Sequence, residues 1–183
     1  MNSYQLPSLD DVSQTLSAFV RREVYVTAAK PGGDGHLPLA GIYHDGNRKQ
    51  VVACMADVGF AAASSAAFAL IPARVAAEST AAQKLDESLA EIFSEVLNVM
   101  SRLFTHHENI RVTLQETVMP GQPLPAVLGS LSRESCLDLV VDIDGYGKGR
   151  AQCVEICTQH PAGLHPIGHI GAGVQRCDRC HAG

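Results

Sequence analysis

Apolar residues recur three and four residues apart in two parts of the chain. This helical spacing predicts helices over residues 10–22 and 81–105. Residues 59–70 are rich in Ala and apolar almost throughout, which predicts a buried helix, and Pro72 ends or kinks it. Thr80 and Gln83 have the spacing of a capping box, so we expect the third helix to begin beside them.

Runs of β-branched and aromatic residues predict the strands. These runs cover residues 23–28, 37–44, 50–58, 110–118, 137–143 and 151–158. Turn residues at 45–47 and 144–149 join two pairs of strands as hairpins. Because the strands come in runs and do not alternate with helices, the order predicts an α+β fold, with two long helices packed on a mainly antiparallel sheet.

Composition limits both the core and the function. Apolar residues make up 46 % of the 183 residues, but aromatic residues only 5 %, and Trp is absent, so Ala, Val, Leu and Ile must build the core. The 14 basic and 19 acidic side chains give a net charge of −5, and no Lys/Arg cluster stands out. Such a surface argues against nucleic acid and against an anionic membrane as partners. The N-terminal residues lack the pattern of a signal peptide, which predicts a cytoplasmic protein.

The last 25 residues differ from the rest of the chain. Residues 159–183 show no periodicity, so we expect a folded domain over residues 1–158 followed by a flexible tail. The tail contains Cys177, Cys180 and His181 in a C-x-x-C-H pattern, which is also found at c-type haem attachment sites. Three interpretations stay open: a tail with incidental thiol and imidazole groups, a zinc or other metal site, and a haem site.

The third helix carries the candidate chemistry. Its apolar stripe is formed by Leu85, Leu89, Ile92, Val96, Met100 and Leu103. A separate polar face carries Glu91, Glu95, Asn98 and Arg102, which fall within an arc of roughly 60°. The simplest interpretation is a solvated helix surface. Asn98 favours a functional one, because Asn is a mediocre residue inside a helix.

The polar face also resembles a known signature. Glu91, Glu95 and Asn98, with Pro120 after 21 intervening residues, resemble the motif of the CheC/CheX/FliY family of receiver phosphatases, with Glu91 in place of the usual Asp or Ser. The motif occurs once, as in CheX-type members, and the resemblance extends over roughly residues 8–158. It implies the α+β fold of that family and a homodimer.

The resemblance further implies hydrolysis of the aspartyl phosphate on a CheY-like receiver domain. Asn98 would orient the attacking water, since a carboxamide both donates and accepts hydrogen bonds. Glu95 would pair with a Lys of the receiver, and Glu91 and Arg102 would add partner contacts. Mg²⁺ would be held by the receiver, and no cofactor by this chain. Two alternatives remain: a non-catalytic binding module for a receiver or flagellar partner, and a metal-binding protein that uses the tail.

Overall fold

The computed structural model describes residues 6–29, 36–47, 49–104, 111–123, 125–129 and 136–156. The helices are α1 (Leu9–Val20), α2 (Val58–Ala69), α3 (Ala73–Ala82), α4 (Glu87–Met100) and the short α5 (Ala126–Gly129), with a 3-10 segment η1 (Ser101–Phe104) directly after α4. The strands are β1 (Val24–Ala28), β2 (Leu39–His44), β3 (Gln50–Ala56), β4 (Thr113–Val118), β5 (Cys136–Ile143) and β6 (Gly147–Glu155). The fold is α+β, as predicted.

The strands form one sheet in the order β1-β5-β6-β3-β2-β4. Every neighbouring pair runs antiparallel. The predicted hairpins are present: β2 pairs with β3, and β5 pairs with β6 across a turn that contains Gly145 at φ +77°. Within the described residues β1 and β4 are therefore the edges of the sheet.

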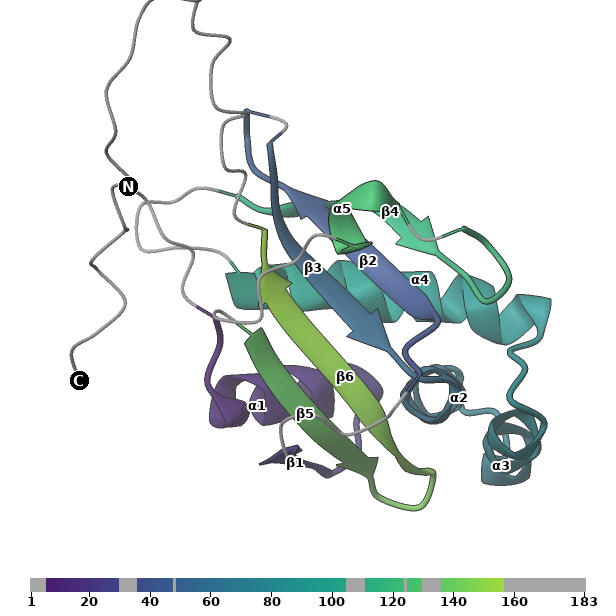
Figure 1. The fold of residues 1–183 in the computed structure, drawn as a ribbon. Helices are drawn as coiled ribbons and strands as arrows, with labels where there is room; N and C mark the ends of the chain where they lie inside the picture. The colour runs from purple at the N-terminus through teal and green to yellow at the C-terminus, as the bar shows by residue number, and fades with distance from the viewer. Residues whose placement is uncertain are drawn as a thin grey trace, which may run out of the picture.

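Helices α1, α2 and α4 cover one face of the sheet, and α5 lies on the other (Figure 1). The main core lies between the three helices and the sheet and is built mostly from Ala, Val, Leu and Phe side chains. A small second cluster on the opposite face joins Ile42, Ala53 and Ile156 to Val127 and Leu128 of the α5 segment. Because the helical face contains almost the whole core, the helices on it are the rigid part of the molecule.

The N-terminus of α2 lies directly against β6. One carboxylate, that of Asp57, accepts hydrogen bonds from the Phe60 N–H at 2.7 Å and from the Arg150 N–H at 2.9 Å. A Cβ on Gly149 would come within 1.9 Å of the Phe60 nitrogen, so only glycine permits this approach. Helix α2 is thereby fixed on the centre of the sheet.

The predicted helix over residues 81–105 is wrong in its limits. Thr80 lies inside α3, and Gln83 is the left-handed residue that ends it, so these two residues do not form a capping box. Helix α4 begins only after Asp86, and its last turn tightens into η1. Helix α3 was not predicted, because Pro72 was interpreted as a break, whereas it stands at the N-cap position of α3.

Two further expectations lie partly outside the described residues. The domain boundary near residue 158 and the tail with Cys177, Cys180 and His181 fall beyond residue 156, so they stay predictions. Strand β6 ends at Glu155 and begins four residues earlier than predicted, at Gly147. Among the described helices, none has the length and apolar character needed to cross a membrane.

Candidate active site

Asp86 fixes the beginning of the candidate helix. Its Oδ1 accepts hydrogen bonds from the Leu89 N–H at 2.8 Å and from the Ser88 hydroxyl at 2.7 Å. The Leu89 N–H is the main cause of a lowered pKa of the Asp86 carboxyl. A carboxylate at this position also suits the positive end of the helix dipole.

The inner side of α4 is wider than the predicted stripe. Leu89, Val96 and Met100 are buried as expected, but Ile92 and Leu103 are only half-buried. Phe93 and Leu97, which the stripe did not include, are fully buried. Phe93 meets Phe60 of α2 edge to face, with ring centroids 5.9 Å apart. Since α4 contacts both the sheet and α2, its buried arc is broader than a single stripe.

Two residues of β2, Tyr43 and Gly41, lie next to the second half of α4. The buried Tyr43 hydroxyl donates a hydrogen bond to the Leu97 carbonyl at 2.8 Å. Burial is the main cause of a pKa of Tyr43 well above its ordinary value, so this hydroxyl stays protonated. A Cβ on Gly41 would lie 3.3 Å from the Leu97 Cδ1, so the glycine makes room for the helix. Leu97 directly precedes Asn98, so the hydrogen bond from Tyr43 fixes the backbone beside Asn98.

Neither Tyr43 nor Gly41 was singled out from the sequence. A glycine inside a strand signals a close approach of another segment, and Gly41 carries that signal. Nothing in the sequence connects Tyr43 to Leu97, because 54 positions separate them.

All four predicted side chains are exposed, but they do not all belong to one helix. Glu91, Glu95 and Asn98 lie on α4, whereas Arg102 belongs to η1. Within the described residues, the two carboxylates and the Asn98 carboxamide make no hydrogen bond or ion pair. We conclude that the fold presents three polar groups, on a rigid helix, whose hydrogen-bonding capacity is left for water or a partner.

Cys54 on strand β3 belongs to the core. Cys54 was predicted to be a core thiol, and it is buried, with its Sγ 2.7 Å from that of Cys153 on the paired strand β6. Burial raises the pKa of Cys54, so the protonated, uncharged thiol is favoured. The described part of the chain contains no group of three His, Cys, Asp or Glu side chains placed to hold a metal ion.

Comparison with known proteins supports the fold. A FliM middle domain from H. pylori aligns over 81 % of this chain and 84 % of its own length, at 8 % identity and a TM-score of 0.55. A FliM middle domain from Vibrio alginolyticus aligns over 80 % and 86 %, at 10 % identity and a TM-score of 0.52. A chain from the CheX–CheY–BeF3–Mg complex of Borrelia burgdorferi aligns over 80 % of this chain and 94 % of its own length, at 13 % identity and a TM-score of 0.49.

No protein-family model matches the sequence, and a comparison with curated proteins finds no match. At these identities the likeness concerns the fold alone. The fold that the resemblance implied, that of the CheC/CheX/FliY family, is confirmed. The roles of Glu91, Glu95, Asn98 and Arg102 remain to be argued from their own chemistry.

Proposed function

We propose that this protein hydrolyses the aspartyl phosphate of a CheY-like receiver domain. The observation that carries the proposal is the Asn98 carboxamide: exposed, without a partner in the described residues, and borne on a helix whose neighbouring backbone is fixed by Tyr43. The exposed carboxylates of Glu95 and Glu91 precede it by about one turn and about two turns, respectively. This arrangement suits a group that enters another protein's site and leaves most of the chemistry there.

The reaction needs little from this chain except a positioned water. The water oxygen forms a bond to phosphorus while the bond to the aspartyl oxygen breaks, which releases phosphate and restores the aspartate. The carboxamide oxygen of Asn98 would accept a hydrogen bond from this water and align it opposite the leaving oxygen. The amide does not titrate near neutral pH, so its donor and acceptor stay constant. Alignment of this kind is a large part of phosphoryl-transfer catalysis.

The charged side chains would hold the partner in register. Glu95 lies close to one turn before Asn98 and would pair with a receiver Lys, and Glu91 would extend the acidic contact. Mg²⁺ would be supplied by the receiver, where it neutralises the phosphoryl oxygens. Arg102, beyond Asn98, would contact a partner group of opposite charge.

We also propose a homodimer, as the resemblance implies, and a cytoplasmic location. Strands β1 and β4 are open edges of the described sheet, and an open edge can pair with a second copy. This assembly would leave the exposed face of α4 free for a receiver.

The test is phosphate release from phosphorylated receivers encoded by the same organism. The unsubstituted chain is expected to speed release from at least one receiver. Asn98→Ala should reduce that acceleration by on the order of 10² without a loss of stability, as is found for other preorganised polar groups. Gln115→Ala, which removes an exposed carboxamide on β4, is the matched control and should retain full activity. Full activity of the Asn98→Ala variant would refute the assigned role.

The alternative is a binding module that docks a receiver or a flagellar partner without hydrolysis. The fold leaves this open, since two of the aligned structures are FliM middle domains. In that case receivers would bind, but their phosphate would be lost at its own spontaneous rate. Phosphate release therefore separates the two functions.

A further inference from the structure

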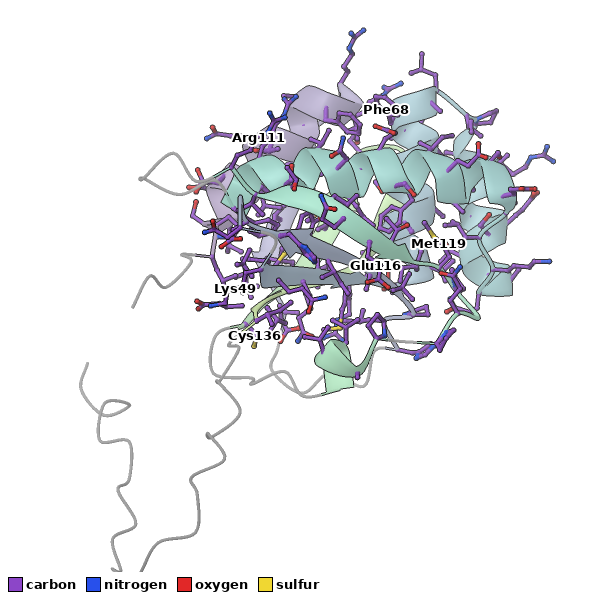
Figure 2. All side chains as sticks on the ribbon, turned by 90° about the horizontal axis from the view of Figure 1, so that it is seen from above. Lys49, Phe68, Arg111, Glu116, Met119 and Cys136 are labelled. Carbon is purple, nitrogen blue, oxygen red and sulfur yellow. The ribbon has the colours of Figure 1, made fainter. Side chains whose placement is uncertain are left out.

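A groove of about 690 Å³ opens beside the exposed face of α4. Three helices and the η1 segment contribute to it. Phe19 of α1 and Phe68 of α2 stack face to face, with ring centroids 4.1 Å apart. Figure 2 shows Phe68 on the side of the molecule where α1 and α2 lie next to α4. The groove is lined by Phe19, Arg21, Phe68, Leu70, Val99 and Arg102, among others.

Two large apolar side chains of the groove are exposed. Among the described residues three large hydrophobic side chains are exposed, and two of them, Phe68 at 40 % and Leu70 at 73 %, line this groove. Scattered single exposures are ordinary, but two such side chains in one concave place suggest a surface that a partner covers.

Leu70 is unusual both in its backbone conformation and in its exposure. It ends α2 in a left-handed conformation at φ 57°, a place where glycine is the usual residue. Such a conformation is unfavourable for a residue with a Cβ. The Leu70 side chain is also 73 % exposed, so burial does not offset the backbone strain. A strained and exposed leucine fits a role in binding better than a role in folding.

The rim of the groove is basic. Arg21 and Arg102 are its two charged lining residues, and no carboxylate is among the described residues that line it. A partner that fits must offer an apolar side chain next to acidic groups. The last 27 residues of this chain do not, since Arg176 and Arg179 outnumber their single acidic residue, Asp178. A second copy placed symmetrically on the groove would bring the same arginines together.

The groove shares Arg102 with the polar face that carries the candidate site. Val99 follows Asn98 directly, and Arg102 lies four residues beyond it. The exposed face of α4 and η1 therefore changes sign along its length, from Glu91 and Glu95 before Asn98 to Arg102 after it. A protein that covers Asn98 would extend over the groove at the basic end.

We propose that the groove is the second half of the receiver-docking surface. It takes an apolar side chain, flanked by carboxylates, that lies on the receiver beside its phosphorylated aspartate. This inference rests on the proposed function for its choice of partner. The reversal of charge along the face then allows the receiver to dock in one direction only, with its Lys at Glu95 and its acidic, apolar element at Arg102 and Leu70.

The experiment measures the dissociation constant for receivers activated with beryllium fluoride and Mg²⁺, using the full chain. Leu70→Gly suits the left-handed cap, so it should keep or raise the stability of the fold while it weakens binding about tenfold. Arg102→Glu should weaken binding by at least as much. Tyr25→Ala, which removes the third exposed large side chain, and Arg74→Glu, on α3, are the controls and should leave binding within about twofold.

The outcomes separate this inference from the proposed function. If phosphate is released but Leu70→Gly and Arg102→Glu bind like the unsubstituted chain, the groove proposal is overturned and the phosphatase stands. If binding depends on both residues but no phosphate is released, the groove proposal stands and the phosphatase falls. Failure of the unsubstituted chain to bind any receiver overturns the groove proposal, as does a Leu70→Gly variant whose only change is loss of a homodimer.

Discussion

Asn98 owes its candidate role to what surrounds its backbone as much as to its own amide. The residue before it, Leu97, is fully buried, and the Leu97 carbonyl accepts the hydrogen bond of the Tyr43 hydroxyl. This hydrogen bond reaches the last turn of α4 from outside the helix and ties it to strand β2. The contact therefore joins the core of the sheet to the one residue that would touch the reacting water.

Tyr43→Phe tests this link. The change leaves the ring in place but removes the buried hydrogen bond from the Tyr43 hydroxyl to the Leu97 carbonyl, which should lower the free energy of unfolding by about 1 kcal/mol. Because Asn98 is then held less firmly, the turnover number for phosphate release should fall while KM stays close to its original value. Urea denaturation and steady-state kinetics measure the two effects.

Tyr25→Phe is the matched control for that substitution. Tyr25 is 58 % exposed, and its hydroxyl bonds the side chain of Glu23 at the surface. Its loss should change the unfolding free energy by no more than about 0.5 kcal/mol. Equal stability of the Tyr43→Phe variant and the unsubstituted protein would contradict the structural role assigned to Tyr43.

At the scale of elements, the beginning of α4 is set by a single carboxylate. Asp86 is nearly fully accessible, yet its pKa is lowered, chiefly by the Leu89 N–H and then by the Ser88 hydroxyl. Because the pKa of Asp86 is lower in the folded chain than in the unfolded one, the ionised carboxylate stabilises the fold at pH values above the ordinary pKa of 3.8. This contribution to the free energy of unfolding is lost as the pH falls through the lowered pKa.

The pH dependence of the Asp86→Ala variant follows from that sign. At pH 7 the variant should be less stable than the unsubstituted chain by about 1 kcal/mol, the usual cost of losing such a cap. The difference should shrink at about pH 3, where most Asp carboxyls become protonated. Asp86→Asn keeps an acceptor that does not titrate. The difference in unfolding free energy between Asp86→Asn and Asp86→Ala should therefore be the same at both pH values. An Asp86→Ala deficit of the same size at both pH values would contradict this account.

The elements also show where sequence patterns succeed and fail. The strands are marked by β-branched runs and turn residues, so the limits of the strands along the chain were predictable to within a few residues, and so were both hairpins. The break between α3 and α4 was not, because it contains neither Gly nor Pro. Gln83 takes the left-handed conformation that glycine usually supplies. The capping signal at Asp86 was overlooked because Thr80 and Gln83 match a better-known pattern.

For the molecule as a whole, the sheet carries α1, α2 and α4 on one face, and the candidate residues lie on the exposed surface of these helices and of η1. The polar face of α4 was predictable, since Glu91, Glu95 and Asn98 follow helical spacing within 8 positions of each other. The groove was not, because Phe19, Phe68 and Val99 come from three separate helices. Only the packing of those helices brings the stacked rings next to the candidate site.

Removal of residues 159–183 tests the extent of the functional unit. The described core ends at Ile156, whose N–H donates to the Val51 carbonyl at 2.8 Å and whose side chain is 6 % exposed. Truncation after Thr158 should therefore leave both the unfolding free energy and phosphate release unchanged. Truncation after Glu155 also removes Ile156 and should cost about 2 kcal/mol of stability. If the chain that ends at Thr158 no longer releases phosphate, the tail has a function, as the metal-binding alternative requires.

The most direct test of the central claim is the rate of phosphate release from one phosphorylated receiver in a single turnover, with the unsubstituted chain in excess and then with Asn98→Ala. Our account predicts rapid release with the unsubstituted chain and a rate lower by on the order of 10² with the variant, while both bind the receiver. Equal rates for the two proteins would contradict the claim that Asn98 positions the attacking water.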